Sequence, residues 1–422
     1  MRKILQSILK TLTRSVLKKY RPVIITVTGS VGKTSTKEAI YHVLKNHFGE
    51  IMVRRNQRNY NNEIGVPLTI FGLETGGRSI FRWLLRFLKI FWMVIVRVTY
   101  PSFLVLEMGA DRPGDIEYLT NFIQPDVGVI TAIGEIPVHV EFFSAPDQVA
   151  QEKRKLVSRL KEDGVAILNY DDDKVREMAE GLKSKILTYG LKEKADVRAI
   201  NYELKVSPST ALITSELNFK LEFKGSTVPA KLINVLGIQH LYSALAAAAT
   251  GITFGMNLVE IVEALKELQP LPGRMHLIKG IKNTLIIDDS YNAALLSVEA
   301  AIDSLKIFEG RRKITVLGDM LEIGEYAPEA HRRAGRKAAE IADLIFAVGS
   351  RAKFIVESAT KSGFDEKKIF QFDVSADAAK IVQEQIQEGD IILVKGSRAM
   401  KMEEIIKEIM AEPDKAEELL VS

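Results

Sequence analysis

The chain has 422 residues, 46% hydrophobic and 27% charged, with 58 Lys and Arg against 54 Asp and Glu. This length allows about two or three domains, the near-average composition excludes a disordered or collagen-like chain, and the net charge of +4 is too small to indicate a nucleic-acid partner. The absence of cysteine excludes a disulfide scaffold, an iron–sulfur cluster, a thiolate metal site and a cysteine nucleophile.

Residues 1–21 predict a basic amphipathic helix. They include seven Lys or Arg and no acidic residue. Their apolar side chains recur at helical spacing: Ile4, Leu5, Ile8, Leu9, Leu12 and Val16. A secretory signal would need an unbroken apolar stretch, which Lys10 and Arg14 interrupt.

The next block, residues 22–270, alternates strands with helices. Strands are predicted at Val23–Val27, Phe103–Leu106, Asp126–Thr131 and Val165–Leu168, and helices at Ser35–Lys45, Pro146–Leu160 and Gln239–Thr250. Such βαβ patterning predicts an α/β fold with a parallel central sheet and helices on both faces. Short alternating runs within residues 196–235 predict antiparallel strands.

The turn after the first strand carries the strongest single motif, Thr28-Gly29-Ser30-Val31-Gly32-Lys33-Thr34-Ser35. Gly29 and Gly32 allow successive backbone N–H groups to face phosphate oxygens, and the new helix adds its positive N-terminal end. Lys33 places a cation on the β- and γ-phosphates, and the Thr34 hydroxyl is suited to Mg²⁺. We therefore predict a phosphate-binding loop for ATP formed by Gly29, Ser30, Val31, Gly32, Lys33, Thr34 and Ser35.

A hydrophobic insertion at about 73–100 separates this loop from the second strand. It holds both tryptophans, Trp83 and Trp92, and four cations that fall near one helical stripe: Arg82, Arg86, Lys89 and Arg97. Its longest uncharged run, Ile90–Val96, is far below the ~20 residues that a transmembrane helix needs. Residues 1–20 and 80–98 are each typical of a helix in the membrane interface, or of a helix packed on the protein's own core or on a second subunit.

The last block, residues 271–422, begins after Leu271-Pro272-Gly273 and predicts a second, smaller domain. Strand–helix alternation returns, with strands at Thr284–Ile287, Lys313–Leu317, Leu344–Val348, Ile369–Phe372 and Ile391–Val394. This pattern predicts a C-terminal Rossmann-like domain.

Several segments together resemble the Mur ligase family, and within it the branch that adds D-Ala-D-Ala to a muramoyl tripeptide. Besides the phosphate-binding loop they are Asn59-Tyr60-Asn61-Asn62-Glu63-Ile64-Gly65-Val66-Pro67-Leu68-Thr69, Glu107-Met108-Gly109-Ala110, Asp288-Asp289-Ser290-Tyr291-Asn292-Ala293 and Lys395-Gly396-Ser397-Arg398. The resemblance covers about residues 22–410. It implies a P-loop ATPase domain followed by a Rossmann-like C-terminal domain.

The chemistry implied by the resemblance is amide ligation through an acyl phosphate, with ATP and Mg²⁺ as cofactors. Lys33, His139 and Lys153 are the catalytic residues that it implies, and Thr34, Glu107, His139 and a carbamylated Lys153 the metal ligands. It adds Arg274, Asp289 and Asn292 to the nucleotide site. The motif residues Asn61, Asn62, Lys395, Ser397 and Arg398 are the expected substrate contacts.

The expected organisation is a basic helix (1–21), a central ATPase domain (22–270) and a C-terminal domain (271–422). The family's N-terminal domain, which binds the UDP end of the substrate, is not expected, because the phosphate-binding loop starts at residue 28. The partners would be a peptide-bearing cell-wall precursor and an amino acid or dipeptide. The location would be the cytoplasm, with peripheral contact at the inner face of the membrane.

Three functions remain open at this point. The first is a peptide ligase of cell-wall precursor synthesis, acting on a UDP-sugar or a lipid-linked acceptor. The second is another amide ligase of the superfamily, of the polyglutamylating or archaeal wall-peptide type. The third is a P-loop ATPase or scaffold without ligase activity.

Overall fold

A nine-stranded sheet forms the first part of the computed structural model, which describes residues 2–57, 60–208 and 213–421; Asn59 of the quoted motif lies outside these ranges. The strand order is β2-β3-β1-β4-β5-β6-β7-β8-β9. Neighbours from β2 to β7 run parallel, and β7, β8 and β9 are antiparallel. The strands are β1 (Val23–Thr28), β2 (Val53–Arg55), β3 (Phe103–Glu107), β4 (Val127–Ile130), β5 (Val165–Asn169), β6 (Lys185–Gly190), β7 (Val197–Pro208), β8 (Ile213–Phe223) and β9 (Ser226–Ile233).

Helices cover both faces of this sheet because its central strands alternate apolar side chains between two cores. Ile25 and Val27 of β1 face α2 (Lys33–Phe48), α8 (Gln239–Thr253) and α9 (Leu258–Lys266). Ile24 lies in the opposite core with α1 (Arg2–Tyr20), α3 (Gly65–Phe71), α4 (Ile80–Ile95), α5 (Asp115–Thr120), α6 (Pro146–Ser158) and α7 (Asp173–Glu177).

A six-stranded sheet follows, in the order β10-β11-β15-β12-β13-β14. All neighbours are parallel except β10, which is antiparallel to β11. The strands are β10 (His276–Lys279), β11 (Leu285–Asp289), β12 (Lys313–Gly318), β13 (Leu344–Val348), β14 (Ile369–Phe372) and β15 (Ile391–Lys395). The predicted α/β class, with a parallel central sheet and a Rossmann-like second part, is confirmed.

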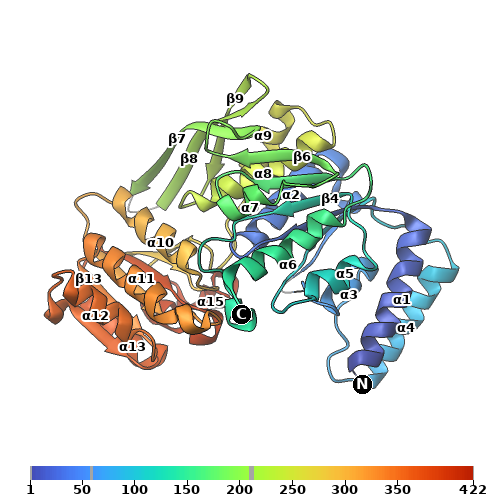
Figure 1. The fold of residues 1–422 in the computed structure, drawn as a ribbon. Helices are drawn as coiled ribbons and strands as arrows, with labels where there is room; N and C mark the ends of the chain where they lie inside the picture. The colour runs from blue at the N-terminus through green and yellow to red at the C-terminus, as the bar shows by residue number, and fades with distance from the viewer. Residues whose placement is uncertain (1, 58–59, 209–212, 422) are drawn as a thin grey trace.

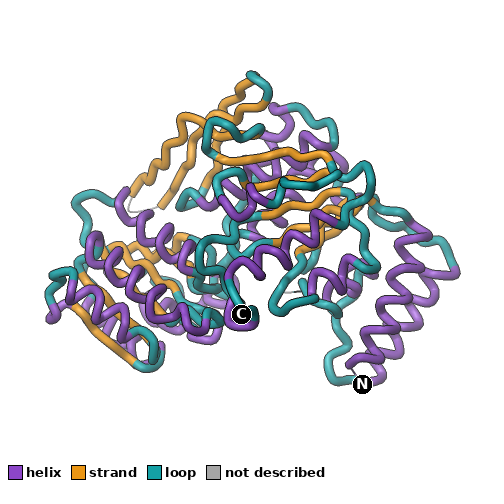
Figure 2. The backbone as a smooth tube through the Cα atoms, viewed as in Figure 1, coloured by secondary structure: helices purple, strands orange, loops and turns teal. Residues whose placement is uncertain are grey.

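Helices also flank the second sheet, so that strands lie between helical layers (Figure 2). One face packs against α10 (Leu295–Ser304), α11 (Ala327–Ile341) and α12 (Lys353–Lys361), and the other against α13 (Ser375–Gln385), α14 (Glu403–Ile409) and α15 (Ala416–Leu419). The first of these cores also contains buried side chains from the preceding part of the chain: Ile136, Val140, Val149 and Leu236. The two sheets are therefore joined by a shared apolar core.

The two basic segments lie side by side at one edge of the molecule, as α1 and α4 (Figure 1). Leu9 and Val16 of α1 are fully buried. Lys19 Nζ donates to the carbonyls of Met93 and Val94, each at 3.0 Å. Packing on the protein's own core is thus observed for α1 and for the inner side of α4. No helix among the described residues is long and apolar enough to cross a membrane.

Replacing a buried side chain of α1 should destabilise the whole fold if this helix belongs to the core. We expect Leu9→Ala to lower the free energy of unfolding by about 2–5 kcal/mol, because it leaves a cavity. Ile4→Ala, on the same helix but 66% exposed, should cost well under ~1 kcal/mol. Urea unfolding of both variants, followed by tryptophan fluorescence, measures the difference; equal losses would contradict this role of α1.

Candidate active site

The phosphate-binding loop lies at the carboxyl end of β1, the central strand between β3 and β4. A Cβ at Gly29 would lie 1.9 Å from Thr131 Oγ1, and Gly32 has a positive φ of 84°, so both positions need glycine. The N–H groups of Ser30 and Val31 donate to the carbonyl of Ala132. The donors that face outward at this turn are therefore those of the first turn of α2, which have no partner within the helix.

Lys33 and Thr34 of this loop lie close to Arg274, a cation from the segment between the two sheets. Lys33 Nζ folds back onto the carbonyl of Gly29 at 2.9 Å. Burial lowers the pKa of Lys33, and the nearby carboxylates Glu107 and Asp111 partly oppose this. Arg274 Nη2 donates to Thr34 Oγ1 at 2.9 Å, and the Arg274 guanidinium lies over the Tyr291 ring.

A nearly buried carboxylate, Glu107, ends β3 beside the loop. Asn61 Nδ2 donates to Glu107 Oε1 at 3.1 Å. Asn56 holds the backbone of the same residue: its Oδ1 accepts from the N–H of Glu107 and its Nδ2 donates to the carbonyl. The buried Lys37 Nζ in turn donates to the carbonyl of Asn56. The position of the carboxylate is therefore set by a network of buried hydrogen bonds.

His139 lies between carboxylates from the two halves of the molecule. Its Nδ1 is 2.9 Å from Glu322 Oε2, and its Nε2 is 3.3 Å from Asp111 Oδ1. The residue adopts a left-handed backbone conformation, with φ of 68°, at the start of a short 3₁₀ turn. Both ring nitrogens therefore have carboxylate neighbours.

Lys153, on α6, is fully buried, and its Nζ has no hydrogen-bond partner among the described residues. Burial and the neighbouring Lys33 lower the pKa of Lys153 to about 7, although Asp111, Glu152 and Asp115 favour its charged form. A substantial fraction of this amine is therefore neutral near pH 7.

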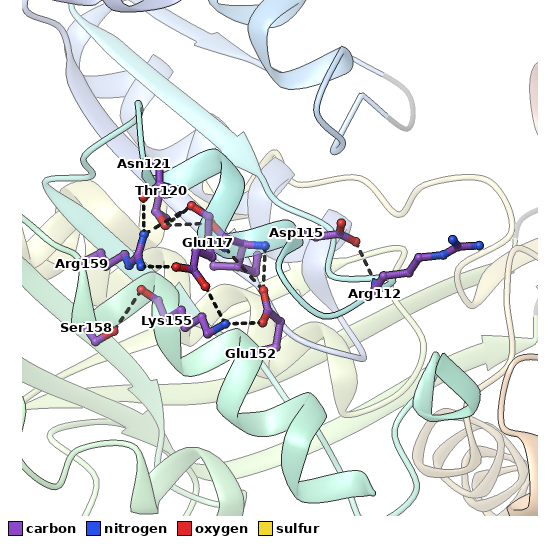
Figure 3. Close-up of polar contacts among 10 residues, drawn as sticks. Arg112, Asp115, Glu117, Thr120, Asn121, Glu152, Lys155, Ser158 and Arg159 are labelled. Atoms are coloured by element: carbon purple, nitrogen blue, oxygen red, sulfur yellow. Dashed lines mark hydrogen bonds and ion pairs between the residues drawn. The ribbon is translucent and has the colours of Figure 1, made fainter. Parts of the chain in front are cut away.

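The helix that presents Lys153 is tied to α5 by an ion-pair network (Figure 3). The buried Glu152 accepts a hydrogen bond from the N–H of Ile116 and pairs with Lys155 Nζ at 2.9 Å. Lys155 also pairs with Glu117, which Arg159 contacts at 2.8 Å. Lys155 thus positions the carboxylate of Glu152, the residue that precedes Lys153 in the chain.

The second sheet contributes a buried pair at the ends of β11 and β15. Lys395 Nζ contacts Asp289 Oδ2 at 2.5 Å and donates to the carbonyl of Asn292. Asp288 beside it accepts from the N–H groups of Gly273 and Ser290. Burial raises the pKa of Asp288 to about 6. These contacts tie the start of the second sheet to the chain segment that carries Arg274.

A cavity of about 910 Å³ brings these groups together between the two sheets. Thirteen of the predicted site residues line it: Ser30, Val31, Gly32, Lys33, Thr34, Ser35, Asn61, Glu107, His139, Arg274, Asp289, Asn292 and Lys395. Neither Gly29 nor the buried Lys153 is among the lining residues. Its size is in the range of small-molecule sites.

The other three predicted substrate residues lie outside this cavity, where they stabilise local structure through hydrogen bonds and an ion pair. Asn62 Oδ1 accepts from the N–H groups of Ile64 and Gly65 at the start of α3. The hydroxyl of Ser397 accepts from the N–H of Leu321, and Arg398 pairs with Glu403 at 2.7 Å. The structure therefore does not bring Asn62, Ser397 or Arg398 to the cavity.

Sequence reasoning missed several residues that shape the site. Asp111 and Glu322 flank His139, and Asn56 positions Glu107, but none of these three lies in a recognisable motif. Tyr242 lines the cavity and donates to Asp171 Oδ2 at 2.9 Å. His240 also lines it, and burial lowers its pKa to about 4, so this imidazole is neutral.

Comparisons with known proteins match both halves of the chain. The Mur ligase middle domain matches residues 27–81 and 93–251, and the Mur ligase glutamate ligase domain matches residues 273–398. The UDP-N-acetylmuramoyl-tripeptide–D-alanyl-D-alanine ligase of Bacillus subtilis strain 168 is 32% identical over 96% of this chain and 79% of the relative. The same-named enzyme of Escherichia coli K12 is 30% identical over 91% of this chain and 76% of the relative.

A solved structure agrees in fold over almost the whole chain. The MurF ligase from Thermotoga maritima in complex with ADP is 25% identical, with a TM-score of 0.77, and the match covers 98% of this chain and 84% of that one. The two sheets with a phosphate-binding loop at their shared cavity define an ATP-dependent acid–amino-acid ligase. The chain belongs to the Mur ligase family.

The shifted pKa of Lys153 predicts a pH-dependent stability. Between pH 7 and about 10.4, the unfolded chain binds a proton at this lysine that the folded protein does not bind, so folding becomes more favourable as pH rises. We expect Lys153→Met to be more stable than wild type near pH 7, and this advantage to shrink towards pH 10. Denaturant unfolding at several pH values in CO₂-depleted buffer measures it. For the exposed control Lys367→Met, the difference in unfolding free energy from wild type should not change with pH. A pH-independent difference for Lys153→Met would contradict the lowered pKa of this buried amine.

Proposed function

We propose that this ligase joins D-Ala-D-Ala, or a similar amine, to the peptide carboxylate of a peptidoglycan precursor. The observation that carries the proposal is the cavity in which the phosphate-binding loop faces Arg274, Asp289 and Lys395. The relatives from Bacillus subtilis and Escherichia coli, named for addition of D-Ala-D-Ala to a UDP-muramoyl tripeptide, support the choice of substrates. Because the proposed reaction consumes ATP, its expected location is the cytoplasm.

The reaction proceeds in two steps that conserve atoms and charge. A carboxylate oxygen of the acceptor attacks the γ-phosphorus of ATP, which gives an acyl phosphate and ADP. The amine nitrogen then attacks the acyl carbon, loses a proton, and expels inorganic phosphate to leave an amide. The first step brings a carboxylate next to a triphosphate, so cations must offset the repulsion between the two anions.

Two cations of the cavity are placed for this task. Lys33 lies in the first turn of α2, whose N-terminal N–H groups favour phosphate oxygens. Arg274 reaches the same place from the segment that leads to the second sheet. Because Arg274 is bonded to the Thr34 hydroxyl in this structure, nucleotide binding would transfer its donors from that hydroxyl to phosphate.

The donors present fit a magnesium ion next to this loop. Thr34 Oγ1 and the Glu107 carboxylate both line the cavity, and Mg²⁺ prefers such oxygen ligands, completed by water and phosphate. No group of three or more His, Asp or Glu side chains suited to a metal occurs among the described residues. The ion would therefore rely on the nucleotide for much of its coordination. Bound there, it would neutralise charge on the transferred phosphoryl group.

Carbamylation of Lys153 would add an anionic oxygen ligand, and His139 would assist at a second metal. A neutral amine can attack CO₂ to form a carbamate and release a proton, and the lowered pKa of Lys153, about 7, leaves a substantial fraction of this amine neutral near pH 7. Among the residues that the structure describes, its Nζ has no hydrogen bond that this reaction would have to break. These features support the carbamate.

The proposed activity is tested by product analysis. With ATP, Mg²⁺, UDP-N-acetylmuramoyl tripeptide and D-Ala-D-Ala, we expect a pentapeptide product by mass spectrometry, and release of ADP and phosphate only when acceptor and amine are both present. Lys33→Ala should lower the rate by at least about 10²–10³, because it removes the cation at the transferred phosphate. Lys45→Ala is the matched control and should retain activity, because Lys45 lies in the last turn of the same helix and does not line the cavity.

Other outcomes of this assay discriminate among the candidates. Turnover with a lipid-linked acceptor or with a different amine would replace the proposed substrates but keep the ligase reaction. ADP release independent of any amine would contradict ligation.

A second variant tests Lys153. We expect Lys153→Ala to be inactive and to be partly rescued by short-chain carboxylic acids, because a free carboxylate can occupy the place of the carbamate. The exposed Lys367→Ala should show neither the loss nor the rescue. Full activity of Lys153→Ala without added acid would show that the lysine has no role in the reaction.

A further inference from the structure

The outer side of α4 carries a continuous apolar stripe. Its side chains recur every three or four positions and are all more than half exposed: Phe81, Leu84, Leu88, Phe91, Trp92 and Ile95. Ile90 is the one fully buried side chain of the helix. Scattered apolar residues are normal on a surface, but a stripe along 16 residues of one helix marks a contact site.

The inner side of α4 packs against the core of the protein. Ile90 is buried in the core beneath the central sheet, and Trp83, Phe87, Met93 and Val94 pack against that core. The main-chain carbonyls of Met93 and Val94 accept hydrogen bonds from Lys19 of α1. The outer stripe is therefore not required for packing within the chain. Residues 82–92 also fall in the gap of the match to the middle-domain family model.

The charge around the stripe is predominantly positive, although Glu63 pairs with Arg2 of α1 and Arg86 of α4 donates to the carbonyl of Glu74. Residues 1–21 and 75–106 contain twelve Lys and Arg and no Asp or Glu. The other 46 Lys and Arg face 54 Asp and Glu, so the rest of the chain has a net charge of −8. On α4 the exposed cations Arg82 and Lys89 lie seven residues apart, on one side of the apolar stripe.

We propose that α4, supported by α1, docks on the surface of an anionic lipid bilayer. The apolar stripe would enter the headgroup region and the flanking cations would contact lipid phosphates, as amphipathic helices with aromatic and basic residues do. The helix would lie in the plane of the surface, because its 16 residues, about 24 Å, are too few to span the hydrocarbon layer.

The positive charge of this patch favours an anionic bilayer over a second copy of the chain as the partner of the stripe. A symmetric dimer through the stripe would bring two clusters of cations together without a single acid from the same segments. Like charges placed opposite each other weaken such an interface. An anionic surface instead attracts every cation in the patch, and each one near the surface gains ~1 kcal/mol.

Co-sedimentation of the full chain with lipid vesicles tests the proposal. We expect pelleting with vesicles of phosphatidylcholine and phosphatidylglycerol, little with phosphatidylcholine alone, and release at about 0.5 M salt because the attraction is screened. Emission of the tryptophans should shift to the blue on binding, and Trp92→Phe should remove most of the shift, since Trp92 is the more exposed of the two.

Matched variants separate the apolar and charged contributions. Phe81→Ser, Leu88→Ser and Phe91→Ser combined should weaken binding more than about tenfold. The control triple Ile51→Ser, Val259→Ser and Val374→Ser removes equally exposed apolar side chains elsewhere and should bind like wild type. Arg82→Gln with Lys89→Gln should weaken binding by about 30-fold, from ~1 kcal/mol for each cation. The pair Lys367→Gln with Lys368→Gln is its control.

Three results would overturn the proposal. One is equal pelleting with neutral and anionic vesicles. Another is binding that the stripe variant and its control weaken equally. The third is a dimer in analytical ultracentrifugation that the stripe variant dissociates, with no vesicle binding by wild type. Circular dichroism and the ATP-dependent activity should be the same for all four multiple variants, because none of the changed residues lies in the cavity.

Discussion

The site depends on two desolvated lysines at the carboxyl edge of one parallel sheet, the partly buried Lys33 and the fully buried Lys153. Removing an ammonium group from water is unfavourable, so each such group needs nearby anions or must lose its proton. The sheet supplies the anions because parallel strands end at the same edge, which brings Glu107 and Asp111 next to the loop after β1. Lys33 bonds to its own loop, whereas Lys153 is partly deprotonated. The same sheet edge thus places a hydrogen-bonded lysine and a partly neutral one close together.

Much of this arrangement follows from the sequence, because strong local patterns define it. The runs at Val23–Val27 and Phe103–Leu106 became β1 and β3. In the loop, Gly29 is required by the close approach of Thr131, and Gly32 by its positive φ. Contacts between distant segments left no such signal. The bond from Arg274 to Thr34 and the contact between His139 and Glu322 depend on how the two sheets pack, which periodicity does not encode. Motifs also do not distinguish a side chain that faces a ligand from one that caps a turn, as Asn62 does.

The contacts of the two basic segments, residues 1–20 and 80–98, also could not be predicted from the sequence alone. Amphipathic spacing indicates that a helix has an apolar side, but α4 is apolar around most of its circumference, with cations on a single stripe. The sequence therefore left packing and membrane contact as alternatives, and the structure shows why both were reasonable. One apolar side of α4 meets the core together with α1, and another faces solvent. Which side is covered was decided by the position of α1, about 70 residues earlier in the chain.

The apolar contact between the two sheets has a consequence for turnover. Ile136, Val140, Val149 and Leu236 come from the first part of the chain but are buried in the core of the second. Moving the sheets apart would expose these side chains to water, and full exposure of one such side chain costs ~1.5–3 kcal/mol. The arrangement of the two sheets in this structure is therefore favoured even without a ligand. If a product must wait for the sheets to separate, the rate of that separation is an upper limit on the catalytic cycle, however fast the amide bond forms.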